Sequence, residues 1–600
     1  MQAPTPKNPI SIVPVLPPAI RTWAQPLEPA LLRLLIPGEL MDSFEKARTA
    51  GGGASFARSL LESLNIRFTV DTSDLARVPI SGPAIVVANH PYGFVEGLIL
   101  AVMLDGLRPD SKIVANALLA GVAKMLDQMI LVNPFETPSA VLENRAPLRE
   151  ALRWLSRGGL LAMFPAGEVA HLNWREHSVT DPPWKTTAAR LALHARCAVV
   201  PVFFEGANSV PFQLAGTLHP GLRTINLARE FHKLSGKTVG VRIANPIPHG
   251  VLAGYRDPGI ATAYMQSRTF LLSQRSRPVS IRPPSKQAGP GCRKIEMPES
   301  ENRLAEEVAA LPAECELAAS SESTVYVAGA AAIPRILREI GRCRELTFRA
   351  AGEGTGKATD LDHFDQYYQH LFLWSKSDRR LAGAYRLVVT SDVLPRMGVH
   401  GLYTSTLFRY HRQFFDRIGP AVELGRSFVM PEYQKNYASL LLLWKGITRF
   451  VQRRPEAPVL FGAVSINKGY QDASKGLIAN YLSGRASHEL ARYVQPRKRF
   501  RHPAMRNSQI RRFAALAVDI EDVSNSVADI EHDAKGVPVL LRQYLKAGGR
   551  ALAFNLDPNF SDVLDALIVA DLRTAPLALL ERCMGRAEAK AFLESHQRAS

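Results

Sequence analysis

From about residue 65 onward, short apolar runs alternate with segments whose apolar residues recur at helical spacing. The apolar runs predict buried strands at 84–88, 112–115, 129–132, 160–164, 198–204 and 239–243. Helical spacing predicts helices over 145–157 and 186–195. Strands that alternate with helices in this way are typical of a mainly parallel sheet. We therefore predict an α/β domain over residues 65–273.

The chain on either side of this domain has a different character. Residues 1–64 begin with a proline-rich stretch and contain three short apolar helices, over 29–36, 40–47 and 54–64. We expect this segment to face a membrane, and packing onto the next domain is the alternative. Residues 274–300 are polar and rich in Pro and Gly, as linkers are. Predicted helices at 304–317, 333–348 and 439–449 then indicate a second domain over 301–600.

Composition narrows the classes of partner. The 600 residues carry a net charge of +18 and 46% hydrophobic residues, so a basic globular protein with an anionic partner is expected. No zinc-finger spacing or aromatic RNA-binding signature is present. The five cysteines are scattered, which suits a reducing compartment. No apolar run reaches the ~18 residues that span a bilayer. We expect a cytoplasmic protein, peripheral on the inner membrane, that binds no nucleic acid.

The first candidate chemistry follows the predicted strand 84–88. His90 and Glu96 are six residues apart, which on a regular helix would set them roughly 120° apart around the axis. Pro91 and Gly93 disfavour a helix at this point, so the two side chains can meet. A His general base oriented by an acid would suit acyl transfer to a hydroxyl. A turn that only caps the following helix is the alternative.

Four blocks in this half resemble one family in order and type. They are Asn89-His90, Phe164-Pro165-Ala166-Gly167, Pro183-Trp184-Lys185 and Val200-Pro201-Val202. Together they resemble the glycerolipid acyltransferases related to lysophosphatidic acid acyltransferase. The resemblance implies catalysis by His90 and Glu96 and substrate binding by Asn89, Gly167 and Lys185, with a solvated Lys185 as the alternative.

Two departures from the family pattern bear on the substrate. The acid is Glu96, one residue later than the Asp usual in the family, which resembles a subgroup described loosely as hemolysin-like or ornithine-lipid acyltransferases. Where phosphate-using members carry an Arg in their second block, this chain has Val132-Asn133-Pro134-Phe135. Loss of that guanidinium removes a strong phosphate clamp, so an acceptor without phosphate is expected.

The second half carries a separate set of residues, all charged except one phenylalanine. Glu423 and Arg426 lie in one predicted strand, where a regular pleat would put them on opposite faces; a bulge at Gly425 would bring them together. The full set is Arg344, Phe348, Asp362, Asp365, Arg386, Glu423 and Arg426. A network of ion pairs with a purely structural role is one interpretation.

The spacing of this set resembles the acyl-homoserine-lactone synthases and the N-acyltransferases that begin ornithine-lipid synthesis, both relatives of the general N-acetyltransferase (GNAT) fold. The resemblance implies a mixed sheet with helices, Glu423 as the catalytic acid that receives a proton, and the other six residues as substrate-binding. The glycine-rich acyl-CoA loop is reduced to residues 434–439 without glycine, which favours acyl carrier protein as donor.

The two resemblances together imply a bifunctional enzyme of ornithine-lipid synthesis. The C-terminal domain would transfer a 3-hydroxyacyl group from acyl carrier protein to the α-amine of ornithine, and the N-terminal domain would acylate the 3-hydroxyl of the product. Neither reaction requires a metal or a bound cofactor. The alternatives are the same chemistry on glycine and a non-catalytic protein that binds an anionic membrane surface.

Overall fold

The computed structural model describes residues 37–116, 128–133, 138–173, 178–213, 220–276, 292–434, 437–485, 489–557 and 563–597. The chain forms two compact units. The first contains Met1–Ser276 and Ala515–Ala534, and the second contains Arg277–Ala514 and Lys535–Ser600. Residues 1–36 and 277–291, which include parts of the predicted N-terminal segment and linker, lie outside the described residues.

The first unit is built on a seven-stranded sheet in the order β1-β9-β8-β2-β5-β3-β4. Only the β8–β9 pair is antiparallel among the described pairings of this sheet, so the predicted mainly parallel sheet is confirmed. The strands are β1 (Arg67–Val70), β2 (Ala84–Ala88), β3 (Ser111–Asn116), β4 (Met129–Val132), β5 (Leu160–Met163), β8 (Ala198–Phe204) and β9 (Thr238–Ile243); a hairpin adds β6 (His171–Asn173) and β7 (Ser178–Thr180).

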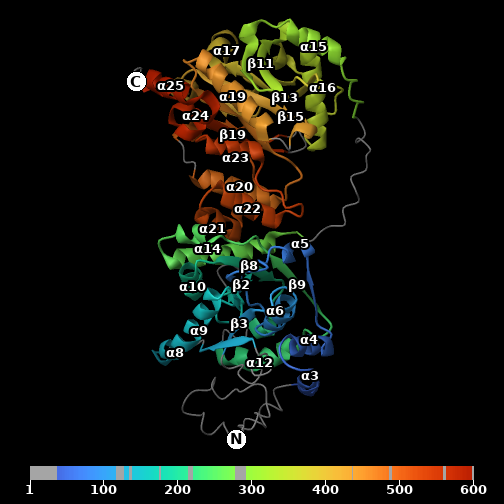
Figure 1. The fold of residues 1–600 in the computed structure, drawn as a ribbon, viewed down its shortest axis with the longest axis vertical. Coiled ribbons are helices and arrows are strands. Elements are labelled where there is room, and N and C mark those ends of the chain that lie inside the picture. The colour runs from blue at the N-terminus through green and yellow to red at the C-terminus, as the bar shows by residue number, and fades with distance from the viewer. Residues whose placement is uncertain are drawn as a thin grey trace. The chain divides into compact units, whose positions relative to one another are not determined.

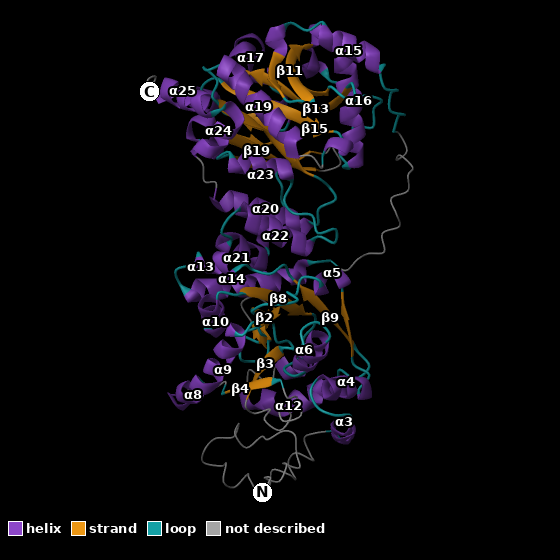
Figure 2. Cartoon of the chain, in the orientation of Figure 1, coloured by secondary structure: helices purple, strands orange, loops and turns teal. Residues whose placement is uncertain are grey.

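Helices cover both faces of this sheet, as continuous apolar strands require. Figures 1 and 2 show them around the strands of the first unit. They are α3 (Gly38–Thr49), α4 (Ala54–Ser63), α5 (Thr72–Leu75), α6 (Val95–Asp105), α8 (Pro138–Glu143), α9 (Arg145–Ser156), α10 (Thr187–Ala195), α12 (Pro220–His232), α13 (His249–Ala253), α14 (Pro258–Leu271) and α22 (Ile520–Ile530).

Helices α3 and α4 turn their apolar side chains inward. Leu40, Phe44, Phe56 and Leu60 are buried in one core cluster with α6 and the strands. The described part of the predicted membrane-facing segment therefore packs onto the domain that follows it. The reason is that its apolar side chains lie on the inner face of each helix, where they extend the core.

The second unit is built on an eight-stranded mixed sheet in the order β10-β11-β12-β13-β15-β16-β19-β18. Its strands are β10 (Glu316–Ala319), β11 (Ser323–Gly329), β12 (Gln369–Ser375), β13 (Arg380–Val389), β15 (Ala421–Val429), β16 (Val459–Ile466), β18 (Arg550–Asp557) and β19 (Val563–Asp571), and β14 (Phe408–Tyr410) pairs with β17 (Val494–Pro496). The α/β class with a mixed C-terminal sheet is confirmed. The helix predicted over 304–317 ends early, because Pro312 cannot continue it and β10 follows.

Helices again flank this sheet in Figures 1 and 2. They are α15 (Glu301–Ala309), α16 (Pro334–Ala350), α17 (Thr390–Met397), α18 (Arg412–Ile418), α19 (Tyr437–Arg453), α20 (Asp472–Arg485), α23 (Val539–Lys546), α24 (Leu577–Met584) and α25 (Arg586–Gln597). Helix α21 (Ser508–Leu516) crosses the boundary between the two units, which lies after Ala514. None of the helices in the described ranges is long and apolar enough to cross a membrane.

Residues 515–534 lie within the range predicted for the C-terminal domain but belong to the first unit. Helix α22 packs against α14 through buried charges. Arg268 contacts Asp522 at 3.2 Å and Asp529 at 2.6 Å, and all three side chains are buried. Arg275 donates to the backbone oxygen of Asp529 at 2.7 Å. Without α22, the buried guanidinium of Arg268 would lose both of these carboxylates, which is a severe cost.

The packing of α22 on α14 predicts how the chain behaves when its linker is cut. When a protease site is placed in residues 277–291 of the full chain and cut, we expect the two fragments to co-elute on gel filtration, even at high salt. The reason is that buried ion pairs are screened little. The variant Asp529→Ala removes the ion pairs of Asp529 with Arg268 and Arg77, at a cost of about 3–5 kcal/mol, and should loosen the association. Clean separation of the unsubstituted fragments would contradict this account.

Candidate active sites

The first candidate site lies at the carboxyl end of β2, in the middle of the parallel sheet. Residues 91–94 are a series of bends rather than a helix, and α6 begins at Val95. The structure thereby brings Nδ1 of His90 to 3.6 Å from Oε1 of Glu96. Crevices at the carboxyl ends of parallel strands are where α/β folds bind ligands.

Glu96 is held by the turn that precedes its helix. It is fully buried in the first turn of α6, and its Oε1 accepts from the backbone N–H groups of Tyr92 at 2.5 Å and Gly93 at 3.2 Å. The helix N-terminus also favours a negative charge. Gly93 has φ 95°, and a Cβ there would lie 2.7 Å from Val169 Cγ2, so the turn needs glycine.

Two buried polar residues fix the backbone on either side of the imidazole. The amide of Asn89 donates to the Phe204 carbonyl at 3.0 Å and accepts from the Phe204 N–H at 2.7 Å, which ties the end of β2 to β8. Asp181 accepts from the His90 N–H at 3.1 Å and from the Trp184 indole at 2.9 Å. Asn89 thus has a positioning role, and Asp181 was missed because it lies 91 residues away.

The surroundings of His90 favour its charged form. Burial lowers the pKa of His90, but the nearby charges of Glu96 and Asp181 outweigh it and the net shift is upward. Burial raises the pKa of Asp181 to about 6, although the hydrogen bonds from Trp184 and His90 oppose this. The imidazole also stacks on Phe164, with ring centroids 4.3 Å apart. An acid that stabilises an imidazolium in this way suits a general base.

The other predicted residues of this half lie close to one another. Gly167 has φ 70°, and a Cβ there would lie 3.5 Å from Nζ of Lys185, so the lysine extends over the glycine backbone. The Lys185 N–H donates to Pro165 at 2.9 Å, which joins the two sequence blocks. Asn133, in the block 132–135 that lacks the arginine, donates to Glu143 at 2.7 Å.

The variant Asp181→Asn should change the pH dependence of the first site. Removing this negative charge lowers the pKa of His90, and a general base works only when neutral. The rise of the O-acylation rate with pH should therefore move to lower pH. A pH–rate profile measures this, with Asp105→Asn at the far end of α6 as the control. An unchanged profile in an active variant would contradict the coupling.

The second candidate site contains three pairs of arginine and aspartate in the second unit. Arg344 donates to Asp365 at 2.8 Å, and Arg386 donates to Asp362 at 2.6 Å and contacts Asp365 at 3.2 Å. Burial opposes the ionised form of Asp365, but Arg344 and Arg386 hold its pKa well below its usual range. Arg344 and Arg386 are fully buried, and each is already paired with a carboxylate. We therefore expect these two arginines to position the aspartates rather than to contact a substrate.

A bulge in β15 follows Gly425, and Glu423 and Arg426 both contact Tyr403. The N–H of Tyr403 donates to Glu423, and its ring centroid lies 5.0 Å from the guanidinium carbon of Arg426. The pairing of β13 with β15 shifts between Ala384 and Arg386, and Arg426 has φ 49°. The predicted bulge is confirmed, with Arg426 itself rather than Gly425 in the left-handed conformation. Arg426 then reaches Asp360 at 3.4 Å and Asp362 at 3.7 Å.

Glu423 lies beneath a turn of backbone. Its oxygens accept from the Tyr403 N–H at 3.1 Å, from the Thr404 N–H at 2.7 Å and from the hydroxyl of Tyr368. Burial raises the pKa of Glu423, although the hydrogen bonds from Thr404 and Tyr368 oppose it. The carboxyl is therefore within a polar network. Tyr403 lines the adjacent cavity, and Glu423 is not among that cavity's lining residues.

The cavity lies where β15 and β16 separate. These strands pair in parallel only from Ala421–Val459 to Glu423–Phe461, and beyond that point both contribute lining residues. The cavity holds about 150 Å³. Its lining comprises Phe348, Glu353, Tyr403, Leu407, Gly425, Arg426, Ser427, Ala463, Val464, Ser465, Pro538, Leu540, Asp557 and Asp565.

Of the predicted residues, Phe348 and Arg426 reach this cavity, whereas Glu353, Asp557 and Asp565 were not predicted. Burial raises the pKa of Glu353 to about 7, and Arg426 opposes this shift. Burial and the charges of Asp557 and Glu353 raise the pKa of Asp565 to about 7. Carboxyl groups poised near neutral pH can both hold an ammonium group and accept a proton from it.

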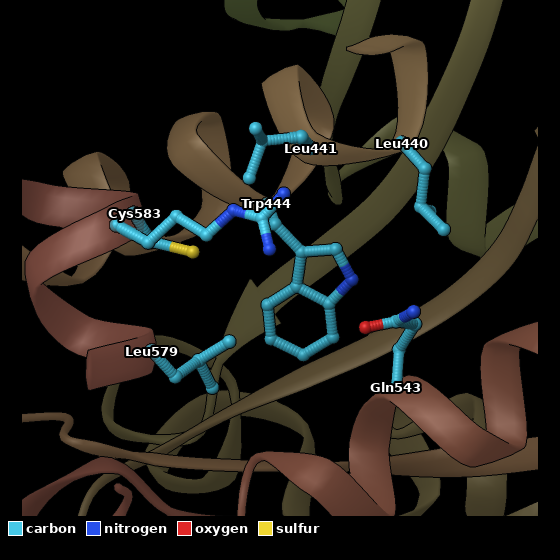
Figure 3. Close-up of a pocket in the computed structure, with 7 residues that line it drawn as sticks. Leu440, Leu441, Trp444, Gln543, Leu579 and Cys583 are labelled. Carbon is cyan, nitrogen blue, oxygen red and sulfur yellow. The ribbon is translucent and has the colours of Figure 1, made fainter. Parts of the chain in front are cut away.

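A smaller hollow of about 20 Å³ lies between α19 and the helices near the C-terminus. Figure 3 shows the Trp444 indole at its centre, between Leu579 and Gln543. Its lining also includes Leu440, Leu441, Arg582 and Cys583 and contains no carboxylate. Its small size and its lining do not suit either of the acceptors expected from the sequence, an amino acid or an N-acyl amino acid.

Comparison with known families assigns a class to each half. Residues 56–256 match the family model described as Acyltransferase, and residues 343–445 match the one described as Acetyltransferase (GNAT) domain. The chain therefore carries two acyltransferase-type domains, as the two resemblances predicted.

The similar proteins fall into the same two classes. A glycine N(alpha)-acyltransferase of Bacteroides thetaiotaomicron is 34% identical over 27% of this chain and 51% of its own length. One of Phocaeicola vulgatus is also 34% identical, over 27% and 53%. A lyso-glycine lipid O-acyltransferase of Phocaeicola vulgatus is 26% identical over 33% and 70%. The chain thus spans about half the length of the two N-acyltransferases.

A solved structure also resembles part of the chain. It is the 1-acyl-sn-glycerophosphate (LPA) acyltransferase from Thermotoga maritima, with 15% identity, a TM-score of 0.25, and coverage of 39% of this chain and 81% of that one.

Proposed function

We propose that this chain is a bifunctional acyltransferase that makes a diacylated amino-acid lipid. The C-terminal site joins a 3-hydroxyacyl group to the α-amine of an amino acid, and the N-terminal site esterifies the 3-hydroxyl of that product. The observation that carries the proposal is the presence of two separate sites in one chain. The first lies within the matched residues 56–256, and the arginines of the second lie within the matched residues 343–445. Having both on one chain keeps the intermediate at a high effective concentration.

At the N-terminal site, His90 removes the proton from the 3-hydroxyl as its oxygen attacks the carbonyl carbon of an acyl thioester. The C–S bond breaks, and the thiol leaves with the proton that the imidazolium returns. Glu96, 3.6 Å from Nδ1, stabilises the imidazolium during this step. Lys185 would neutralise a carboxylate of the lipid or a charge of the carrier protein.

At the C-terminal site, the amino acid arrives as a zwitterion. The guanidinium of Arg426 receives its carboxylate in the cavity, while an acid takes a proton from its ammonium. The free amine then attacks the thioester carbonyl, the C–S bond breaks and the thiol departs. Glu423 was predicted as this acid; it accepts from the Tyr403 N–H at 3.1 Å and so positions Tyr403, which lines the cavity. The proton of the ammonium passes instead to a carboxylate that lines the cavity, Glu353 or Asp565, and the thiolate that leaves takes the second proton of the amine.

The donor proposed for both steps is acyl carrier protein, with no bound cofactor. The support for this is a basic surface in the second unit, where the exposed residues are Arg497, Lys498, Arg499, Arg501, Arg506, Arg511 and Arg512. A strongly positive surface attracts an acidic carrier protein and also the anionic leaflet of the inner membrane. We propose peripheral binding to that leaflet from the cytoplasm.

Two amino acids are candidates for the acceptor of the first acyl group. Ornithine is our first candidate, and glycine is favoured by the names of the similar proteins. The test supplies the purified full chain with 3-hydroxyacyl carrier protein and either amino acid, and identifies the product by mass. We expect an N-acylated and then an O-acylated product. Hydrolysis of the thioester without any amide product would overturn the proposal.

A further inference from the structure

A stripe of arginines runs along α9 on the surface of the first unit. Arg145, Arg149 and Arg153 follow one another at intervals of four residues, and Arg157 comes directly after the helix. Steps of four advance by about 40° around a helix, so the first three side chains share one face. All four arginines are exposed, and none of them forms an ion pair with a described residue. The stripe is therefore a positive surface turned toward solvent.

The acids near the stripe do not neutralise it. Residues 138–157 contain two glutamates, Glu143 and Glu150. Glu150 pairs with Lys112 at 2.6 Å, and Glu143 accepts from the Asn133 side chain at 2.7 Å. Both glutamates thus have partners outside the stripe, and the surface keeps an excess of positive charge that fits an anionic partner.

Two exposed apolar side chains lie in α8, the helix that precedes the stripe. Val141 is 65% exposed and Leu142 is 61% exposed. The Asn144 N–H donates to the Ala140 carbonyl at 2.9 Å, and the Leu148 N–H donates to the Asn144 carbonyl at 3.0 Å, so helical hydrogen bonding continues from α8 into α9. Figures 1 and 2 show α8 at the outer end of α9, away from the sheet. Exposed apolar residues beside basic ones are what interfacial helices present to a bilayer.

The junction of α8 and α9 lies at the same edge of the sheet as His90. Strands β2, β5, β3 and β4 are parallel, so the carboxyl ends of β4 and β2 lie at one edge. The Asn133 N–H, directly after β4, donates to Asn144 Oδ1 at 2.7 Å, and the Asn144 amide donates to the Asn133 carbonyl at 2.8 Å. These bonds fix the junction to the edge at which the candidate site at His90 follows β2.

We infer that this surface docks the first unit onto an anionic bilayer. The α8–α9 surface comprises two exposed apolar residues and four exposed arginines: Val141, Leu142, Arg145, Arg149, Arg153 and Arg157. The apolar pair enters the interface, and the guanidinium groups bind lipid phosphates, which their planar fork suits. Acidic lipids supply the complementary charge. The inference deepens the proposed esterification and rests on it for the nature of the acceptor, an amphiphile that resides in the bilayer.

Co-flotation of the full chain with vesicles measures this docking. One set of vesicles is phosphatidylcholine, and the other contains equal parts of phosphatidylcholine and phosphatidylglycerol. The double variant Arg149→Ala/Arg153→Ala should lower partitioning onto the second set about 10–30-fold, because each basic residue near an anionic surface contributes roughly fivefold. The matched control, Arg67→Ala/Lys237→Ala, removes two exposed charges beside the opposite edge strand, β1, and should change partitioning little. An equal loss in both double variants, or no loss in the first, would overturn the inference.

The variant Leu142→Asp tests the apolar part of the surface, with Ile80→Asp as the control. Ile80 is 85% exposed and lies before β2, at the amino end of that strand. Leu142→Asp should weaken partitioning onto the anionic vesicles about tenfold or more, because it removes a leucine side chain from the interface. Ile80→Asp should leave partitioning unchanged. Equal partitioning by the two variants would contradict insertion of the apolar pair.

Esterification of lyso lipid in detergent micelles separates the possible failures. There the Arg149→Ala/Arg153→Ala variant should work at the unchanged rate, since no bilayer has to be met. Slower esterification in micelles, with vesicle binding unchanged, would assign the surface to the acidic carrier protein and overturn the inference. If the unchanged chain binds anionic vesicles through this surface but forms no ester in any assay, the proposed function fails and the docking surface stands.

Discussion

Replacing His90 with alanine is expected to stop esterification while the N-acyl amino acid continues to be made and accumulates. The rate of O-acylation should fall about 10²–10⁴-fold, the usual contribution of a general base. The physical reason is that Glu96 acts by stabilising the charged imidazole of His90. None of the residues 91–94 is a histidine that could replace it. The measurement is the ratio of lyso lipid to diacyl lipid by mass.

The exposed His194 at the end of α10 provides the matched control, since His194→Ala removes an imidazole far from the turn. It should leave both products unchanged. If His90→Ala abolishes both products in a chain that unfolds at the normal temperature, the two sites do not divide the chemistry as proposed.

The variant Arg426→Ala should have the opposite effect, with loss of N-acylation and retained esterification of supplied lyso lipid. Among the described residues that line the cavity, Arg426 is the one arginine, and it lies in the bulge of β15. Its loss removes the carboxylate partner of the acceptor and leaves Asp360 and Asp362 less well paired. We expect a decrease in rate of roughly 10²-fold or more, similar to removal of a charge-stabilising donor in other active sites.

The control for this variant is Arg417→Ala, which removes an exposed arginine that pairs with Glu489 in the same unit. Its N-acylation rate should remain normal. Arg426→Lys should recover part of the activity, because it restores the charge without the planar fork. Full N-acylation by Arg426→Ala would exclude a role for this residue in acceptor binding.

The sequence predicted those parts of the fold whose signal is local. The continuous apolar runs at 84–88, 129–132 and 198–204 became β2, β4 and β8 with the predicted bounds, because a buried parallel strand needs apolar residues on both faces. Strand β1 was missed, since its residues alternate between exposed and half-buried at the edge of the sheet. Helix α22 could not be assigned to the first unit, because its charged contacts on α14 are about 250 residues away.

The same distinction holds for the candidate sites. His90 and Glu96 were predicted together because one short turn contains both and proline and glycine shape it. A bulge at Gly425 was predicted from the spacing of two charges in one strand, and the structure has the bulge with Arg426 in the left-handed conformation. Asp181 and the three acids of the C-terminal cavity were not found, since separate strands and loops bring them in only after the sheet forms. These residues are far apart in the sequence, so no local pattern predicts that they lie close together.

Expression of the full chain in a bacterial host that lacks aminolipids, followed by mass analysis of its total lipids, tests the central claim most directly. We predict a new lipid in which one amino acid carries an amide-linked 3-hydroxyacyl chain with a second acyl chain esterified to its hydroxyl. A lipid extract identical to that of the host, obtained while the folded chain accumulates, would contradict the claim that these two sites catalyse successive acyl transfers.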